Sequence, residues 1–405
     1  SVCGNGECSD EQREQYQQQP ESCVYGPLRR HACANHPPIK RLSQYALGME
    51  PVKNGDLSAF DMEKGYLVLG SGWHPALFQS EVDSLTEVVK ILTPRIVQVN
   101  SYSGLDDAAT VDQILAQQGI SDVISLPDSF SEWLSANPLN NNESIAVRWS
   151  RHGERKPGVK GIELAKEMGG VLTDAGYKIE LENPEQVIEL LIDGEELYWG
   201  IPLLKEPPRK GWKERVATQR PFFKPVSLDP RHACLMLNLA GRKGPLLDPM
   251  CGTGGVLIES ASSGIESIGV DLDPEMVAGT LQNLEWCAAK ARVLCGDATK
   301  LSELEISGIR MVCFDPPYGR NAWRSDSTPE LFSSVLDSLH SVCNDDAVMC
   351  CMLPSTPDGA LMMGMEWQDI EDLFSSTGWK IDGNWFIPVH ASLGRRLVRA
   401  KRLHS

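Results

Sequence analysis

The sequence predicts an α/β protein whose C-terminal half is a doubly wound, mainly parallel sheet, preceded by smaller α+β regions. Three observations lead to this prediction. From about residue 226 onward, short apolar strands alternate strictly with helical patterns. A glycine-rich turn follows the first of these strands, and acidic residues close the first four. Before residue 206 the strands are short and mixed with helices. Ligands of such sheets bind beyond the carboxyl ends of the strands, so we expect the site there.

Length and composition narrow the class of protein. The 405 residues allow two or three domains, and 41% hydrophobic residues are enough for ordinary cores. No apolar stretch is long enough to span a bilayer, and the polar, acidic first twenty residues lack the pattern of a signal peptide. A net charge of −17 argues against a simple basic nucleic-acid binder. We expect a cytoplasmic protein with reduced cysteines.

Residues 1–45 form a polar segment that contains several cysteines, and we expect it to be a flexible tail. A small zinc site is the alternative. Its spacing, C-x4-C followed by C-x9-C, is not that of a standard zinc knuckle. The candidate ligands are Cys3, Cys8, Cys23 and Cys33.

The N-terminal half is expected to contain two α+β regions, 46–140 and 141–206, although the second could begin as early as 110. Helical spacing of apolar residues predicts helices at 75–92 and around 161–168. Strands are predicted at 65–70, 95–100, 144–150, 177–184, 187–194 and 196–201. A proline-rich and locally basic segment, 207–225, is expected to be a linker.

The C-terminal half, 226–405, carries the clearest alternation. Strands are predicted at 246–248, 267–272, 291–295, 311–315, 348–353, 384–389 and 395–400. Helices are predicted at 254–263, 274–287, 329–343 and 369–377.

The first strand leads into the sequence LLDPMCGTGGVLIES, in which glycines let backbone amides approach a ligand at a helix N-terminus. The dinucleotide pattern would need a third glycine where Leu257 stands, so the turn is not of that type. A tight turn that binds nothing is the alternative for this motif alone.

Acidic residues at the ends of the next two strands strengthen the case for a nucleoside ligand. Asp271, nineteen residues after Gly252, can accept both hydroxyls of a ribose. Asp297 could reach an adenine amino group, although aspartate is common in turns. Asp273, before Pro274, is expected to be a helix N-cap.

The fourth strand ends in the sequence FDPPYG, whose residue types suit an amine that is a poor nucleophile. Asp315 and the Pro316 carbonyl can accept the hydrogens of an exocyclic amine, and the two prolines stiffen the loop. Tyr318 offers a face on which a base can stack. An ordinary proline turn is the alternative.

In this order, the four motifs resemble those of the class I S-adenosylmethionine-dependent amino-methyltransferases, which have a Rossmann-like seven-stranded sheet. The resemblance implies that Asp248 and the glycine turn hold the methionine end of the cofactor, while Asp271 takes the ribose and Asp297 with Ala298 the adenine. No covalent intermediate is needed. The implied cofactor-binding residues are Asp248, Met250, Cys251, Gly252, Thr253, Gly254, Gly255, Asp271, Leu272, Asp297, Ala298 and Asp315, and the implied catalytic residues are Asp315, Pro316, Pro317 and Tyr318.

With its flanks included, the chain resembles the archaeal tRNA guanine-N2 methyltransferases that act at position ten. Segment 70–85 is similar to their ferredoxin-like domain, 147–201 to their THUMP RNA-binding domain and 388–400 to their C-terminal strand. The resemblance implies one or two methyl transfers to the guanine N2 amine of tRNA. It leaves open a small zinc-binding activator protein as a partner, and it does not indicate the oligomeric state. Sister enzymes acting at position six usually carry asparagine where Asp315 stands, so the aspartate favours position ten.

Basic residues cluster despite the acidic total, and such clusters can bind tRNA phosphates. A solvated charged face is the alternative for each cluster. The candidates are Arg148, Arg151, Arg155, Lys156, Lys160, Arg209, Lys210, Lys213, Arg215, Arg395 and Arg396.

Other functions stay open at this point. Methylation of adenine N6 would use a similar loop but would not explain the THUMP-like half. Methylation of a protein glutamine would not need the basic linker. A non-catalytic RNA-binding protein is the alternative from another class, and the four intact acids argue against it.

Overall fold

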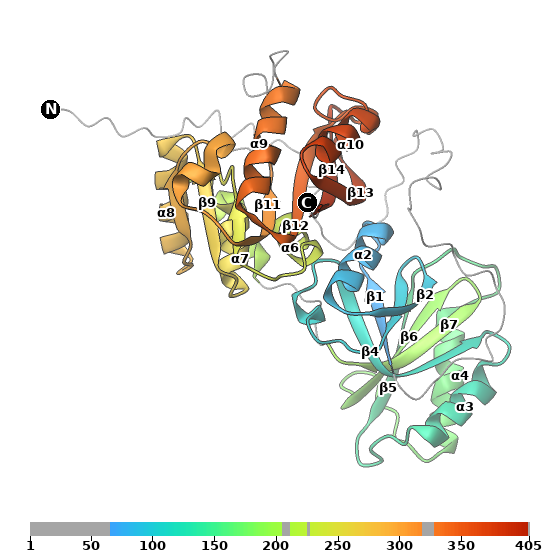
Figure 1. Cartoon of the computed structure of the whole chain (residues 1–405). Coiled ribbons are helices and arrows are strands. Elements are labelled where there is room, and N and C mark those ends of the chain that lie inside the picture. Colours follow the sequence, from blue (N-terminus) through green and yellow to red (C-terminus); the bar gives the residue numbers. More distant parts are fainter. Residues whose placement is uncertain (1–64, 205–210, 225–226, 318–327, 404–405) are drawn as a thin grey trace. The chain divides into compact units, whose positions relative to one another are not determined.

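A computed structural model of the chain describes residues 65–204, 211–224, 227–317 and 328–403 (Figure 1). The predicted tail and its zinc candidates Cys3, Cys8, Cys23 and Cys33 lie outside these residues. So do Arg209, Lys210 and Tyr318. Within the described residues, no helix has both the length and the apolar character needed to cross a membrane.

The N-terminal half is built on one seven-stranded sheet with the order β2-β3-β1-β4-β7-β6-β5. Its strands are β1 (Tyr66–Gly70), β2 (Val88–Thr93), β3 (Ile96–Val99), β4 (Val111–Asp122), β5 (Ile145–Arg151), β6 (Gln186–Asp193) and β7 (Glu196–Pro202). Its helices are α2 (Pro75–Leu85), η3 (Leu105–Asp107), α3 (Leu126–Ala136) and α4 (Gly161–Asp174).

The long strand β4 joins the two predicted N-terminal regions. One edge of β4 pairs with β1, where Leu67 lies opposite Leu115, and the other edge pairs with β7, where Ile120 lies opposite Tyr198. Strands from 46–140 and from 141–206 therefore share one hydrogen-bonded sheet. The division at residue 140 stays a prediction.

The C-terminal half contains the doubly wound sheet that the sequence predicts, with the order β10-β9-β8-β11-β12-β14-β13. Strands β8 to β12 pair in parallel with one another, while β14 is antiparallel to both of its neighbours, β12 and β13. The strands are β8 (Leu246–Asp248), β9 (Ser267–Asp271), β10 (Arg292–Cys295), β11 (Ile309–Phe314), β12 (Cys343–Ser355), β13 (Trp379–His390) and β14 (Leu393–Arg402). The helices are α5 (Trp212–Arg215), η4 (Ala217–Gln219), α6 (Pro230–Leu239), α7 (Gly255–Ser262), α8 (Pro274–Trp286), η5 (Ala298–Leu304), α9 (Thr328–Val342) and α10 (Trp367–Ser376).

Strand β11 shows why both faces of this sheet are covered. Successive side chains of a strand point to opposite faces. Val312 and Phe314 pack with α9 and α10 in one core, whereas Met311 and Cys313 pack with α6 in another. The strand is therefore apolar from Met311 to Phe314, and the next polar side chain, Asp315, comes where the chain leaves the sheet.

Two local predictions are wrong. A helix was predicted over 75–92, but α2 ends at Leu85 and Val88–Thr93 is the strand β2. Thr86 is already extended, and its hydroxyl donates to the carbonyl of Ser101; the β-branched pair after it favours a strand. The predicted strand 177–184 forms only an isolated bridge from Ile179 to Ile145.

Candidate active site

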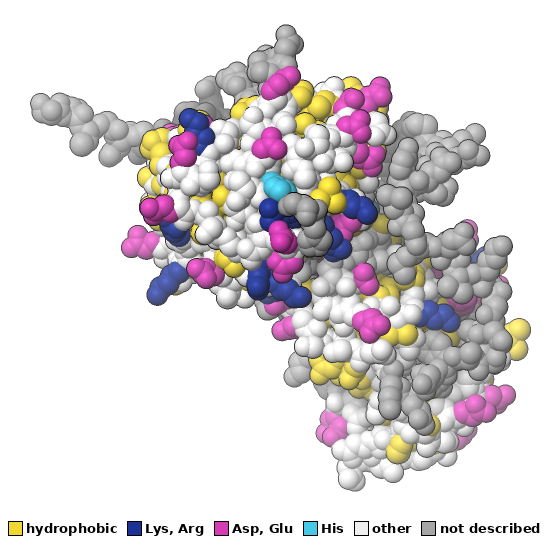
Figure 2. Space-filling model, in the orientation of Figure 1, with side chains coloured by type: hydrophobic (Ala, Val, Ile, Leu, Met, Phe, Trp, Pro, Cys, Tyr) yellow, Lys and Arg dark blue, Asp and Glu magenta, His cyan; other side chains and the backbone are white. Residues whose placement is uncertain are grey.

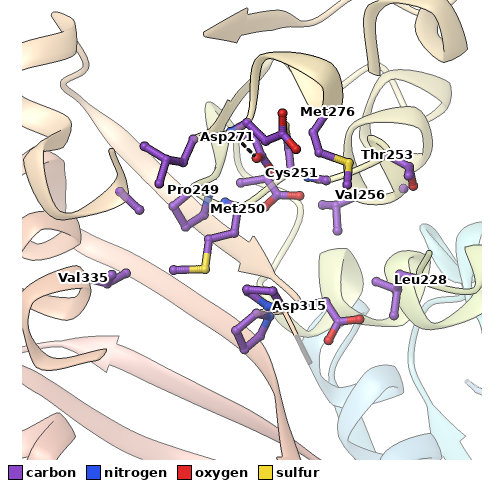
Figure 3. A pocket seen from close by; sticks show the side chains of 18 of the residues that line it. Leu228, Pro249, Met250, Cys251, Thr253, Val256, Asp271, Met276, Asp315 and Val335 are labelled. Atoms are coloured by element: carbon purple, nitrogen blue, oxygen red, sulfur yellow. Dashed lines mark hydrogen bonds between the residues drawn. The ribbon is translucent and has the colours of Figure 1, made fainter. Parts of the chain in front are cut away.

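A cavity of about 340 Å³ opens at the carboxyl ends of the parallel strands (Figure 3). Side chains reach it from the β8–α7 turn, from the ends of β9 and β11, from the start of η5 and from α9. Four acidic residues that were predicted from their places after separate strands, Asp248, Asp271, Asp297 and Asp315, all line it. The structure therefore brings together motifs that lie up to 67 residues apart in the sequence.

The glycine turn is held in a conformation that suits close approach by a ligand. Gly252 and Gly254 have positive φ angles of 52° and 80°, which side chains rarely tolerate. Thr280 donates from its hydroxyl to the Gly252 carbonyl at 2.6 Å, and Asn283 donates to the Thr253 carbonyl at 2.9 Å. Helix α8 therefore fixes the turn from behind.

The Asp271 carboxylate links the second strand to this turn. Its Oδ2 accepts from the Gly252 amide at 2.8 Å, and its Oδ1 accepts from the Asp273 amide at 3.0 Å. The next residue, Leu272, is 72% exposed at the cavity. Asp273 accepts from the Glu275 amide and caps α8, as predicted.

Asp297 caps the short helix η5 that begins at Ala298. Its Oδ1 accepts from both the amide and the hydroxyl of Thr299, at 2.9 and 2.8 Å. These bonds hold the pKa of Asp297 below its usual range, so the group is a carboxylate at neutral pH. Its second oxygen accepts no hydrogen bond that the described residues supply, and the residue lines the cavity.

Burial shifts the pKa values of Asp248 and Cys251 in the opposite direction, upward. The pKa of Asp248 is raised well above its ordinary value, chiefly by burial, with the charges of Asp271 and Asp315 adding to the effect. Burial also raises the pKa of the Cys251 thiol. The thiol is thus a weak nucleophile, in agreement with a direct transfer.

Asp315 stands where β11 ends, with its side chain only 10% exposed. Burial raises its pKa to about 7, and the charge of Arg395 acts in the opposite direction. One oxygen, Oδ2, lies 3.3 Å from Nη1 of Arg395. The other, Oδ1, is buried without a hydrogen-bond partner among the described residues. Pro316 and Pro317 line the cavity beside it.

The predicted RNA-binding residues are placed unevenly. Arg155, Lys156, Lys160 and Lys213 are exposed. Arg148 and Arg151 each donate to a main-chain carbonyl of the fold. Arg396 lies between Asn384, to which it donates, and the ring of Trp367.

Arg215, also predicted to bind RNA, is bonded to another side chain of the fold. Its guanidinium makes two bonds of 2.8 and 2.9 Å with the carboxylate of Glu259, whose side chain is 4% exposed. This pair lies within the fold, so Arg215 is not a free phosphate contact. The basic composition of the linker could not reveal a partner 44 residues away.

Several residues of the cavity were not predicted. Ser227 bonds the hydroxyl of Thr253 at 2.8 Å and lines the cavity with Leu228. Leu331 and Val335, one helical turn apart on α9, close another side. Their i, i+4 spacing on a helix that follows the Asp315 loop is a signal that could have identified them. No group of side chains in the described residues could hold a metal ion.

Comparison with known proteins places the chain among RNA methyltransferases. The family described as UPF0020, RMKL-like, methyltransferase domain matches residues 217–376. A tRNA (guanine(10)-N2)-dimethyltransferase of Pyrococcus abyssi is 34% identical over 239 residues, which is 58% of this chain and 68% of that protein. The chain belongs to the tRNA (guanine(10)-N2)-dimethyltransferase family.

A second relative extends the comparison to the N-terminal half. The tRNA (guanine(10)-N2)-dimethyltransferase of Methanothermobacter thermautotrophicus is 27% identical over 345 residues, 81% of this chain and 97% of that protein. Among solved structures, that of TrmN from Thermus thermophilus covers 84% of this chain and all of its own, with 16% identity and a TM-score of 0.48.

The cavity of this family member fits S-adenosylmethionine. Its donors are backbone amides at the N-terminus of α7, where a sulfonium amino acid's carboxylate can be bound. Its acceptors include Asp271, the last residue of β9, and Asp297, two residues after β10, and carboxylates can accept from ribose hydroxyls and from an adenine amino group. The glycine turn leaves room for close approach, since a Cβ on Gly252 would meet no atom within 4 Å.

Proposed function

We propose that the chain is an S-adenosylmethionine-dependent tRNA (guanine-N2)-methyltransferase that acts at position ten and adds one or two methyl groups. Membership of the dimethyltransferase family supports the substrate and position. The observation that carries the chemistry is Asp315, a buried carboxyl at the cavity with one oxygen that accepts no hydrogen bond from the described residues.

The residues that would bind the cofactor fall into groups, one for each part of the ligand. Asp271 would accept the ribose hydroxyls, and Asp297 with Ala298 would meet the adenine, against which the exposed Leu272 can pack. Asp248 and the glycine turn would surround the methionine part. When bound, S-adenosylmethionine supplies an electrophilic methyl group with a good leaving group.

The chain's own part in the reaction is to hold and orient the amine. The lone pair of an exocyclic amine is delocalised into the base, so the nitrogen must be turned toward the methyl group. Asp315 Oδ1 can accept one N–H and the Pro316 carbonyl the other. Orientation of this kind can be worth roughly 7–11 kcal/mol. Asp315 acts as acceptor rather than strong base, because the amine loses its proton readily once it is methylated.

Binding of tRNA would use the exposed cations of the N-terminal half, chiefly Arg155, Lys156 and Lys160. Contacts of this kind fix the position of a nucleic acid without reading its sequence. They would also offset the cost of moving the target base out of its stack, about a few kcal/mol.

The decisive experiment is to incubate the purified chain with labelled S-adenosylmethionine and unmodified total tRNA, digest to nucleosides and identify the product by mass spectrometry. N2-methylguanosine or its dimethyl form supports the proposal, and mapping by primer extension then tests position ten. Methyladenosine would contradict the substrate. Transfer that requires a small zinc-binding activator protein would identify the chain as one subunit of the active enzyme.

A further inference from the structure

We propose that Arg395 is a positioning residue for the reaction: it fixes one oxygen of Asp315 and so presents the other to the substrate amine. The inference rests on the proposed function, in which Asp315 is the acceptor. Its place in a basic cluster suggests that Arg395 binds phosphate, and the inference gives it this different role instead. Three observations support it.

The first support is the register of the sheet. Phe314 of β11 lies opposite Cys351 of β12, and three residues further along β12, Pro354 lies opposite Arg395 of β14. Arg395 is therefore level with the loop that follows β11, although β12 separates the two strands. Its side chain is 15% exposed, so it spans this distance inside the fold.

The second support is that the two carboxylate oxygens of Asp315 have different surroundings. Oδ2 lies 3.3 Å from the guanidinium of Arg395, whereas Oδ1 is buried and accepts no hydrogen bond from the described residues. A buried acceptor without a partner is costly unless a ligand completes it. Figure 3 shows Asp315 at the cavity, among Met250, Leu228 and Val335. A cation on one oxygen thus leaves the other to accept from an amine.

The third support is the charge around this pair. Burial raises the pKa of Asp248 of β8, and the charges of Asp271 and Asp315 add to the effect. Burial likewise raises the pKa of the Cys351 thiol on β12, and the charge of Asp315 adds to the effect. His232 of α6 is neutral, because burial lowers its pKa to about 4 and Arg395 adds to that effect. Among these groups, Arg395 is the one that favours the ionised form of Asp315.

The test compares three purified variants with the wild type: Arg395→Gln, Arg395→Lys and Arg402→Gln. Arg402 is the matched control, since it stands on the same strand and pairs with Asp345 at 2.7 Å, away from the cavity. For each protein we would measure kcat and KM for tRNA, the Kd of S-adenosylhomocysteine, and the dependence of kcat on pH.

We expect Arg395→Gln to lower kcat about 10²-fold, the size of loss that misplacement of a reacting group causes. KM for tRNA and the Kd of S-adenosylhomocysteine should stay within about twofold. The acid limb of kcat should move to higher pH, since loss of the cation raises the pKa of Asp315 further. Arg395→Lys should restore the acid limb and part of kcat, and Arg402→Gln should match the wild type.

A variant Arg395→Gln with normal kcat, or one whose main defect is a raised KM for tRNA, would overturn the proposal and favour phosphate binding. The same holds for a fall in kcat with an unchanged acid limb. If the wild type methylates another nucleoside, the comparison is made on that product. The proposed substrate would then be wrong, while the role of Arg395 would still be decided.

Discussion

At the scale of single residues, the carboxyl groups that line the cavity at the ends of the strands have different environments. Hydrogen bonds from Thr299 lower the pKa of Asp297, whereas burial raises the pKa of Asp248 well above its ordinary value. Asp315 lies between these extremes, with a pKa of about 7. Different pKa values among neighbouring acids are typical of sites in which each acid has its own role.

Asp315→Asn tests the acceptor. The amide keeps the size of the side chain but can turn an NH2 toward the amine, so we expect loss of methyl transfer by about 10²-fold or more. The Kd of S-adenosylhomocysteine, measured by calorimetry, should change little. The exposed Asp346→Asn, on β12, is the control. Equal loss of binding and turnover would mean that Asp315 holds the cofactor instead.

The raised pKa of Asp315 also predicts a pH dependence. The proton that binds as pH falls through about 7 removes the acceptor, so kcat should fall tenfold for each further unit of pH and level off above it. Initial rates at saturating tRNA and cofactor would show the limb. A kcat that is flat from about pH 6 to 9 would contradict an ionised acceptor.

Site residues that directly follow a strand are easier to predict from the sequence than the partners that distant segments bring to them. An acid after an apolar run is visible as a local pattern, and Asp271, Asp297 and Asp315 were predicted on that basis. Arg395 and Glu259 find their partners through the register of β14 and the packing of α7, which no local pattern contains. Local composition alone therefore places Arg395 with Arg215 among the RNA-binding candidates.

At the scale of elements, the glycine turn before α7 depends on two conformations that only glycine adopts readily. Gly254→Ala adds strain at φ 80° and places its Cβ 2.8 Å from the methyl group of Thr280. We expect a loss of roughly 1–2 kcal/mol in the free energy of unfolding and weaker binding of S-adenosylhomocysteine. Urea denaturation and calorimetry would measure the two effects.

Gly169→Ala is the matched control for that substitution. Gly169 lies within α4, has no positive φ and leaves open space where a Cβ would be. Alanine there should stabilise the fold by roughly 0.5–1 kcal/mol and leave ligand binding unchanged. Similar losses in both variants would show that the turn has no special requirement.

A buried carboxyl group on α2 is hydrogen-bonded to α6. Glu81 is fully buried, and its Oε1 accepts from the Ala109 amide and from the side chain of Asn238, both at 2.6 Å. Burial raises the pKa of Glu81, and hydrogen bonds such as that from Asn238 act in the opposite direction. Asn238→Ala would leave the buried Oε1 short of a donor and should cost roughly 1–3 kcal/mol of unfolding free energy in urea titrations. Gln368→Ala, which removes an exposed hydrogen bond on α10, should change it by less than about 0.5 kcal/mol.

The elements themselves were predictable to different degrees. Continuous apolar runs marked the buried parallel strands, and β8 to β12 were all found. The run at 75–92 was misread because apolar spacing cannot show where α2 stops and β2 begins, and the pairing of β2 with β3 is what decides it. Residue spacing also could not show that 177–184 has a single bridge to β5.

At the scale of the whole molecule, the charge is strongly negative while the substrate is a polyanion. On the face drawn in Figure 2, acidic side chains are spread widely and basic ones gather in small groups. A net charge of −17 disfavours non-specific adhesion to nucleic acid. Binding therefore has to rely on a few local phosphate contacts, and it should weaken steeply with salt.

The double variant Arg155→Gln, Lys156→Gln tests this expectation. Removal of two exposed cations should weaken tRNA binding and lower the slope of log K against log salt by about 1 to 2. Fluorescence titrations at several salt concentrations would measure it. Lys290→Gln, an exposed site before β10, is the control for charge alone. An unchanged slope in the double variant would remove these residues from the interface.

The pairing of β4 with both β1 and β7 has a consequence for anyone who wishes to build chimeras. A junction near residue 140 would cut a sheet whose hydrogen bonds run from one recombined piece into the other. Every strand pair of the first sheet stays whole only if the donor segment runs through Pro202, the end of β7. The two N-terminal regions would thus have to be exchanged between homologues as one cassette.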